Sequence, residues 1–206
     1  MAQVAAVLLA AGFARRFGTQ KLAHAIEING CFKPLIMHSL LPWLSVFERV
    51  TLVINAESSD LKALVNSELT IQQAAKINWK ICESALEGMA ASLACGVKAN
   101  AEASGWLIGL ADMPKVSAPI ISQVRDAITV DTDNGKKLAA PYYKEFRGHP
   151  VGFSTLYFDE LIQLQGDAGA KHLIQRDAAL ITKITSPDDG VLLDIDSPAD
   201  AEKLNN

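Results

Sequence analysis

The feature that most constrains the fold is the alternation of short, apolar, β-rich runs with helix-like segments. Continuous apolar runs are typical of buried parallel strands, because helices cover both faces of such a sheet. Helices are predicted to begin near Pro34, Ser58 and Met89. The first four predicted strands are residues 4–9, 50–54, 77–82 and 106–110. This order predicts an α/β fold, a three-layer, doubly wound sandwich around a mostly parallel sheet, with ligands at the carboxyl ends of the strands.

The pattern changes after residue 128. A turn is predicted at residues 131–135, followed by a polar loop that we expect to overhang the site. No repeat or linker-like composition interrupts the chain, so residues 1–206 are predicted to form one domain. The remaining predicted elements are strand-like pieces at 137–140 and 150–153 on either side of that loop, helices at 155–164 and 168–175, a strand at 179–185 and a helix from Ser197.

Composition excludes several classes of protein. Half of the 206 residues are apolar, and 19 basic residues face 23 acidic ones. A broad electrostatic surface for nucleic acid or anionic lipid is therefore not expected. Cys31, Cys82 and Cys95 are too widely spaced to indicate a disulfide framework or a thiolate zinc site. No apolar run approaches the roughly 20 residues of a membrane span, and residues 4–11 lack a basic leader, so a soluble, cytoplasmic protein is predicted.

The loop after the first predicted strand has the residue types of a phosphate-binding loop. It reads Leu9-Ala-Ala-Gly12-Phe-Ala-Arg-Arg16-Phe-Gly18-Thr-Gln-Lys21. Small residues leave room for a nucleotide, and glycine amides can approach phosphate oxygens. Arg16 and Lys21 can neutralise a triphosphate, each charge pair contributing on the order of 4 kcal/mol at ~4 Å and an effective dielectric near 20. The loop matches neither GxGxxG nor GxxxxGKS, and a generic strand-to-helix loop is the alternative.

This loop resembles the signature LAAGxSxRxGxxK of the MobA-like nucleotidyltransferase superfamily, and within it most closely the molybdenum cofactor cytidylyltransferases of the MocA type. Ala14 replaces the usual Ser, and Phe17 replaces the common Met. The resemblance implies a Rossmann-like, glycosyltransferase-A-like nucleotidyltransferase fold. It also favours CTP and leaves GTP open, because the guanylyl branch usually carries Leu-Ala-Gly-Gly. The matched residues are Leu9, Ala10, Ala11, Gly12, Arg16, Gly18 and Lys21.

An acidic residue follows the fourth predicted strand, in Gly109-Leu-Ala-Asp112-Met-Pro114. Asp112 is thereby placed at the carboxyl end of a central strand. Magnesium prefers one or two carboxylates together with phosphate oxygens and water, so a single Asp here suits nucleotide chemistry. A turn or helix-cap role is the alternative. The resemblance implies that Asp112 is the metal ligand.

A second acidic segment, Asp194-Ile-Asp196-Ser-Pro198-Ala-Asp200, resembles the DIDTPED ending of the same family. Alternation predicts that Asp194 and Asp196 share one face of a strand. One of them is predicted to complete the magnesium site. Asp194 is preferred, because Asp196 or Ser197 can cap the last helix.

Three further segments complete the resemblance. Arg147-Gly-His149-Pro-Val resembles RGHPV of the cytidylyltransferase branch and implies that Arg147 and His149 bind an anionic acceptor, although an ordinary loop histidine is the alternative. Gly166-Asp167-Ala-Gly-Ala-Lys171 resembles GDxGAR and implies that Asp167 and Lys171 also bind the acceptor; a loop capped by Asp167 is the alternative. The segment from Gly88 to Leu93 resembles GxxxSL and implies that Ser92 helps form the nucleotide pocket.

The resemblance implies transfer of CMP from CTP to the phosphate of molybdopterin, giving molybdopterin cytosine dinucleotide and pyrophosphate. Magnesium is the expected cofactor, Arg16, Lys21 and Asp112 are the expected catalytic residues, and a molybdoenzyme is a possible client. Two alternatives stay open. One is a guanylyltransferase or a sugar- or polyol-phosphate nucleotidyltransferase on the same fold. The other is a non-catalytic carrier that inserts the molybdenum cofactor.

Overall fold

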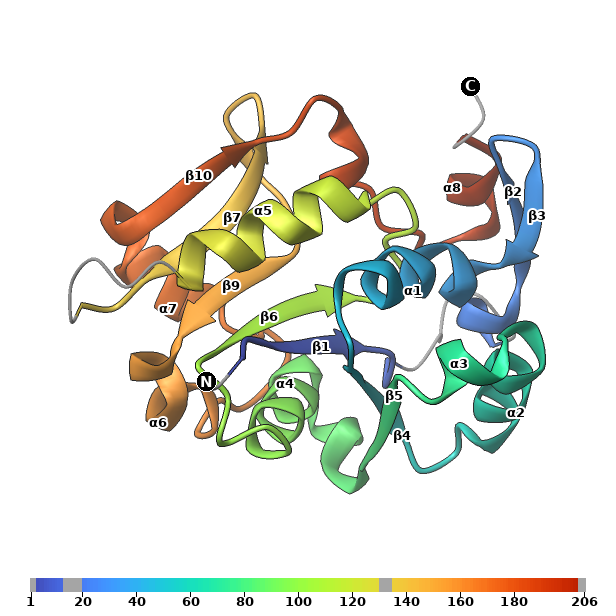
Figure 1. Cartoon of the computed structure of the whole chain (residues 1–206), viewed down its shortest axis with the longest axis horizontal. Coiled ribbons are helices and arrows are strands. Elements are labelled where there is room, and N and C mark those ends of the chain that lie inside the picture. The colour runs from blue at the N-terminus through green and yellow to red at the C-terminus, as the bar shows by residue number, and fades with distance from the viewer. Residues whose placement is uncertain (1–2, 13–19, 130–134, 204–206) are drawn as a thin grey trace.

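The computed structural model describes residues 3–12, 20–129 and 135–203. Its centre is one twisted sheet with strand order β10-β7-β9-β6-β1-β4-β5, and β8 pairs with β7 (Figure 1). The strands β1, β4, β5 and β6 are parallel, and β9 runs antiparallel between β6 and β7. The prediction of a mostly parallel sheet is confirmed. The strands are β1 (Ala5–Leu9), β4 (Val50–Asn55), β5 (Ile77–Cys82), β6 (Gly105–Leu110), β7 (Leu138–Tyr143), β8 (Phe146–Arg147), β9 (Val151–Ser154) and β10 (Ile181–Thr185).

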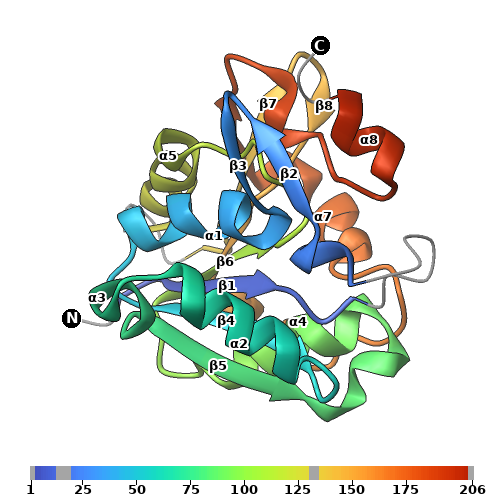
Figure 2. The same ribbon diagram turned by 90° about the vertical axis from the view of Figure 1, so that its right-hand side faces the viewer.

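Helices cover both faces of this sheet because its strands are apolar on both sides. In β1, Ala6 and Leu8 belong to one buried cluster, whereas Val7 and Leu9 belong to the other. Figure 2 shows α1 and α5 on one side of β1 and β6, with α4 and α7 on the other. The first face is covered by α1 (Leu35–Val46), α2 (Ser59–Glu68) and α5 (Ala118–Thr129), and the second by α4 (Met89–Lys98), α6 (Phe158–Leu161) and α7 (Lys171–Arg176). The predicted three-layer α/β sandwich is therefore confirmed.

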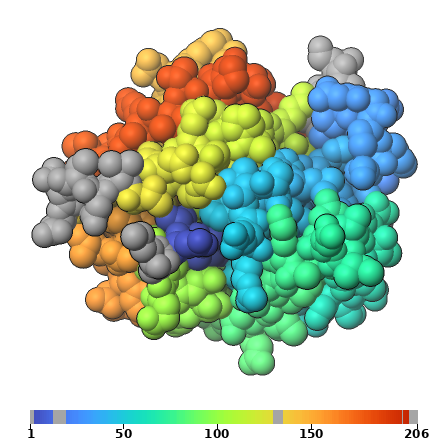
Figure 3. All heavy atoms as spheres, in the orientation of Figure 1, coloured from blue at the N-terminus to red at the C-terminus, as the bar shows by residue number. Residues whose placement is uncertain are grey.

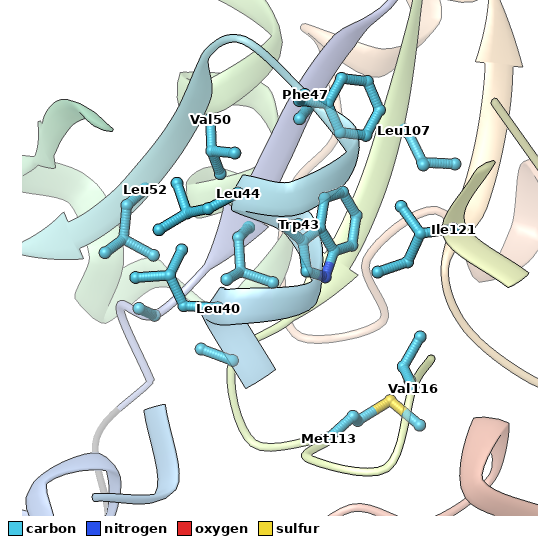
Figure 4. Close-up of a cluster of buried hydrophobic side chains, with 14 of the residues drawn as sticks. Leu40, Trp43, Leu44, Phe47, Val50, Leu52, Leu107, Met113, Val116 and Ile121 are labelled. Carbon is cyan, nitrogen blue, oxygen red and sulfur yellow. The ribbon is translucent and has the colours of Figure 1, made fainter. Parts of the chain in front are cut away.

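Helix α1 supplies much of the packing on the first face. Its side chains Leu40, Trp43 and Leu44, together with Phe47 at its C-cap, meet residues of β4, β6 and α5 (Figure 4). The helices α1 and α5 lie side by side across this face of the molecule (Figure 3). None of the helices in the described ranges is long and apolar enough to cross a membrane.

Several elements differ from the sequence-based expectation. A hairpin, β2 (Ala25–Ile28) and β3 (Cys31–Pro34), forms a separate two-stranded sheet that was not predicted. Its turn, Asn29-Gly30, has positive φ at both residues, which is the Asn-Gly hairpin signal. The short strand β8 and helix α3 (Ile71–Ala74) were also missed. The predicted helix at 155–164 is a 3₁₀ turn, Thr155–Tyr157, followed by the short α6. The turn predicted at 131–135 lies mostly outside the described residues.

One close contact fixes how α1 sits on the sheet. A Cβ atom on Gly109 of β6 would lie 2.2 Å from Cζ2 of Trp43. We therefore expect Gly109→Ala to lower the free energy of unfolding by about 1–3 kcal/mol, since overpacking forces side chains off their rotamers. Urea unfolding measures this change. Gly135→Ala is the control, because a Cβ there meets no atom of the described residues within 4 Å. An equal loss in both variants would contradict the packing explanation.

Candidate active site

A cleft of about 760 Å³ opens at the carboxyl ends of β1, β4 and β6. This is the edge of the sheet where ligands were expected, because the ends of parallel strands meet there. The cleft is lined by Leu9, Ala10, Ala11, Gly12, Gln20, Lys21, Leu22, Asn55, Glu57, Ser58, Leu61, Ala85, Leu86, Gly88, Met89, Ser92, Leu110, Asp112 and Asp167.

The residues predicted to bind a nucleotide meet in this cleft although they lie far apart in the sequence. The loop after β1 forms one part of it, and Ser92 of α4 forms another. Two predicted residues, Arg16 and Gly18, lie outside the described ranges. The predicted residues that line the cleft are Leu9, Ala10, Ala11, Gly12, Lys21, Ser92 and Asp112.

Three charged side chains converge at the cleft. The Lys21 Nζ atom lies 2.8 Å from Asp112 Oδ2 and 3.2 Å from Asp196 Oδ1. Lys21 lies on a short 3₁₀ turn, Lys21–Ala23, and its side chain is only 14% exposed. Burial alone would lower the pKa of Lys21, but the charges and hydrogen bonds of Asp112 and Asp196 outweigh it and raise this pKa. Lys21 is therefore a cation at neutral pH.

The segment that carries Asp196 is irregular, which corrects the prediction of a strand there. Its Ile195 N–H donates to the Asp112 carbonyl at 3.0 Å. Ser197 lies immediately before helix α8 (Pro198–Lys203), and Asp200 Oδ2 in the first turn of that helix accepts from the Ser197 N–H at 2.9 Å and from the Ser197 hydroxyl at 2.7 Å. Asp196 accepts a hydrogen bond from Lys21 Nζ at 3.2 Å. The preference for Asp194 as the metal ligand rested on a helix-cap role for Asp196, whereas the structure places the Asp196 carboxylate on Lys21 beside Asp112.

The carboxylates near Lys21 have the chemistry of a divalent metal site. Asp112 and Asp196 both reach one Nζ atom, so they present two carboxylates to a common point. Hard cations such as magnesium take this donor set and complete it with phosphate oxygens and water. Within the described part of the chain, no group of three or more His, Cys, Asp or Glu side chains is arranged to hold a metal by itself.

Asp194 is the other predicted metal ligand. Desolvation raises its pKa, as do the neighbouring charges of Asp196 and Asp112, which places it in the same electrostatic environment. Its side chain is nevertheless exposed. Its role in metal binding stays a prediction.

A buried residue that sequence reasoning missed ties two loops of the cleft together. Asn55, at the end of β4, donates from Nδ2 to the Ala11 carbonyl at 3.3 Å. Its Oδ1 accepts from the Glu57 N–H at 3.0 Å and from the Ser58 hydroxyl at 2.8 Å. Ser58 does precede α2, as predicted, but its hydroxyl makes this bond and does not cap the helix. The only sequence signal was a polar residue ending an apolar strand.

The start of α4 brings a distant loop into the cleft. Gly88 has φ 118°, a conformation that favours glycine. A Cβ atom there would lie 2.4 Å from Asp167 Oδ1. The Ala90 N–H also donates to the Gly166 carbonyl at 3.0 Å. Asp167, which the sequence grouped with the acceptor, therefore lies beside the segment that holds Ser92.

The other three residues predicted to bind the acceptor do not line the cleft. Lys171 is exposed at the first position of α7. Arg147 is half-buried and donates from Nη1 to the Gly148 carbonyl at 3.2 Å. The His149 N–H donates to the Val191 carbonyl at 2.9 Å. The loop predicted to overhang the site thus packs at this end against residues 189–191.

The ring of His149 has an unusual environment. Its Nδ1 atom is buried and has no hydrogen-bond partner among the residues that the structure describes. Burial, and secondarily the charge of Arg147, lower the pKa of His149 to about 4. His149 is therefore neutral near pH 7 and cannot bind an anion through a positive charge at that pH.

Comparisons with known proteins agree with this arrangement. A family model described as the MobA-like NTP transferase domain matches residues 6–180. No match was found among curated proteins.

Solved structures share the fold over nearly the whole chain. Rv0371c from Mycobacterium tuberculosis H37Rv is 24% identical, with a TM-score of 0.76 over 98% of this chain and 97% of that one. 4-Diphosphocytidyl-2C-methyl-D-erythritol synthase from Anaerococcus prevotii is 14% identical, with a TM-score of 0.74 and coverage of 99% and 95%. Molybdopterin-guanine dinucleotide biosynthesis protein A from Archaeoglobus fulgidus is 16% identical, with a TM-score of 0.62 and coverage of 98% and 97%.

The environment of His149 predicts a pH dependence of stability. The pKa of His149 is about 4 in the folded chain, against the ordinary value of 6.5 in the unfolded chain. As the pH falls, the unfolded chain therefore binds a proton at His149 before the folded chain does, and this favours unfolding. We expect this group to remove about 2–3 kcal/mol of stability between about pH 7 and about pH 4.5. Urea unfolding should show that His149→Phe loses correspondingly less stability over this range. An identical loss in the wild type and the variant would contradict the assignment.

Proposed function

The chain belongs to the MobA-like NTP transferase family, and we propose that it transfers CMP from CTP to the phosphate of a molybdopterin-type acceptor. Members of this family are nucleotidyltransferases, and the chain is such an enzyme. The observation that carries the proposal is the cluster of Lys21, Asp112 and Asp196 beside the loop Leu9–Gly12. The finer assignment of nucleotide and acceptor rests on the motifs in the sequence.

The proposed reaction needs positioning and charge stabilisation and no protein nucleophile. An acceptor phosphate oxygen, already ionised near neutral pH, attacks the α-phosphorus of CTP. The new oxygen–phosphorus bond forms as the bond to the bridging oxygen breaks, and pyrophosphate leaves with the electron pair. Lys21 is a cation in the cleft and can stabilise the charge that develops on the phosphates. Arg16 is proposed to add a second positive charge.

Nucleotidyltransferases of this family use divalent metals, and one structural neighbour, Rv0371c, is described as a complex with manganese. We propose magnesium, held by Asp112 and by Asp196 or Asp194. When bound, the metal supplies positive charge to the phosphate oxygens. Asn55 has a separate role, because its bonds to Ala11, Glu57 and Ser58 keep the two loops of the cleft at a fixed distance.

The choice of CTP and molybdopterin rests on resemblance. The Leu9-Ala-Ala-Gly12 sequence favours the cytidylyl branch. Two structural neighbours, 4-diphosphocytidyl-2C-methyl-D-erythritol synthase and CMP:2-keto-3-deoxy-manno-octonic acid synthetase complexed with CTP, are named for cytidine nucleotides. Another neighbour is named for molybdopterin-guanine dinucleotide biosynthesis, so GTP is the second candidate. Arg147 and Lys171 are proposed to bind the anionic acceptor beyond the cleft, and His149 is proposed to contact it as a neutral ring. A cytoplasmic location and delivery to a molybdoenzyme complete the proposal.

Pyrophosphate release in the presence of magnesium and molybdenum-loaded molybdopterin tests the function. With CTP, we expect Lys21→Ala and Asp112→Asn each to lower turnover by roughly 100- to 1,000-fold, because each removes a preorganised charge. Lys98→Ala and Asp159→Asn, which alter exposed residues outside the cleft, are the matched controls and should keep wild-type turnover. Turnover with GTP alone would overturn the nucleotide assignment. Tight pterin binding without pyrophosphate release would indicate a carrier.

The second metal ligand can be identified by titration. We expect Asp196→Asn to raise the magnesium concentration that gives half-maximal turnover by roughly 10-fold or more. Loss of a residue that only supports a ligand typically changes metal affinity by roughly 10- to 100-fold, and loss of a ligand should change it at least as much. Asp196 approaches the same Nζ atom as Asp112, which is the reason for this expectation. Asp194→Asn is the matched variant two residues away. A larger effect of Asp194→Asn would instead support Asp112 and Asp194, the ligand pair expected from the sequence.

A further inference from the structure

One wall of the cleft is apolar, in contrast to the charged cluster around Lys21. It is formed by the 3₁₀ turn Glu83–Glu87 and the first turn of α4. Leu86 is 68% exposed and Met89 is 44% exposed on this wall. Large apolar side chains that line a concave site mark a surface that a ligand covers. The flat faces of a nucleobase fit this wall, whereas a triphosphate does not.

Asp167 stands on the same wall. Its Oδ1 atom lies so close to Gly88 that any Cβ there would be 2.4 Å away. The adjoining Gly166 carbonyl is held by the Ala90 N–H at 3.0 Å, which fixes the loop on α4. Asp167 is exposed, lines the cleft and makes no hydrogen bond or ion pair with residues in the described ranges. Its carboxylate oxygens are therefore available to accept hydrogen bonds from a ligand.

Charge decides which part of a nucleotide can meet this carboxylate. A triphosphate would be repelled by Asp167, whereas Lys21 together with a divalent cation held by Asp112 and Asp196 would attract it. With the triphosphate at Lys21, the base would lie against the wall that carries Leu86, Met89 and Asp167. A carboxylate accepts from the exocyclic amino group of cytosine, whereas uracil presents an oxygen acceptor at the same position.

We propose that Asp167 is a specificity-determining residue that selects CTP over UTP by accepting a hydrogen bond from the base amino group. The proposal rests on the proposed function for the choice of a cytidine nucleotide. It reassigns Asp167 from the acceptor, where the sequence resemblance placed it, to the base. The reason is its contact with Gly88 on the wall that also carries Ser92.

Equilibrium binding of CTP and of UTP, measured by calorimetry with magnesium and without acceptor, tests this role. We expect the wild type to bind CTP roughly 10- to 100-fold more tightly than UTP. Asp167→Asn should lose most of this preference, because its amide can accept from cytosine and donate to uracil. Asp159→Asn removes one exposed charge outside the cleft and should keep the wild-type ratio. Thermal unfolding of each variant checks that the fold is retained.

The outcomes separate this proposal from the proposed function. An unchanged ratio of CTP to UTP affinity in Asp167→Asn overturns it, even if the separate turnover assay shows a higher KM for the acceptor. Lost base preference supports the proposal even when no pyrophosphate is released, because the measurement contains no transfer step. Failure of the wild type to prefer CTP also overturns it, whatever the turnover assay shows.

Discussion

The hydrogen-bonded cluster of Lys21 with Asp112 and Asp196 joins three parts of the chain. Lys21 follows the first strand, Asp112 lies just after the end of β6, and Asp196 lies in the C-terminal segment. Two carboxylates that share one point repel each other unless a cation lies between them, and a mostly buried ammonium needs opposite charge. Each partner is therefore held in place by the others. The bond from the Ile195 N–H to the Asp112 carbonyl adds a backbone tie at the same point.

This cluster makes one part of the cleft charged, in contrast to its apolar wall. Its charged part suits phosphates and a divalent cation, whereas Leu86 and Met89 on the α4 side suit a base. Asn55 ties the loop after β1 to the loop after β4 with three hydrogen bonds. Such bonds restrain the positions of Ala11 and of residues 57–58 relative to each other. A reaction that depends on positioning benefits from such restraints, because less reorganisation is needed at the moment of transfer.

The features that the sequence patterns missed or placed wrongly share a physical cause. The hairpin turn Asn29-Gly30 carried a local signal, but its strands are short and pack outside the main sheet. Asp194 and Asp196 alternate like strand residues, yet the segment passes across the ends of other strands and has no partner to form a ladder with in the described part of the chain. His149 matched a motif for a surface role, but its Nδ1 is buried beside Arg147. In each case packing between distant segments overrode the local pattern.

The sequence by itself determined the layered α/β fold and the loop Leu9–Gly12 at the end of the first strand. Apolar periodicity and small residues act over a few neighbours, so they can be recognised without knowing the rest of the fold. Only the tertiary structure decided that Asp196 meets Lys21 across 175 positions of the chain, and that Asp167 lies beside Gly88. Those contacts depend on where the C-terminal segment crosses the sheet edge and on how the loop before α7 packs on α4. The spacing of residues along the chain does not reveal the position of either segment.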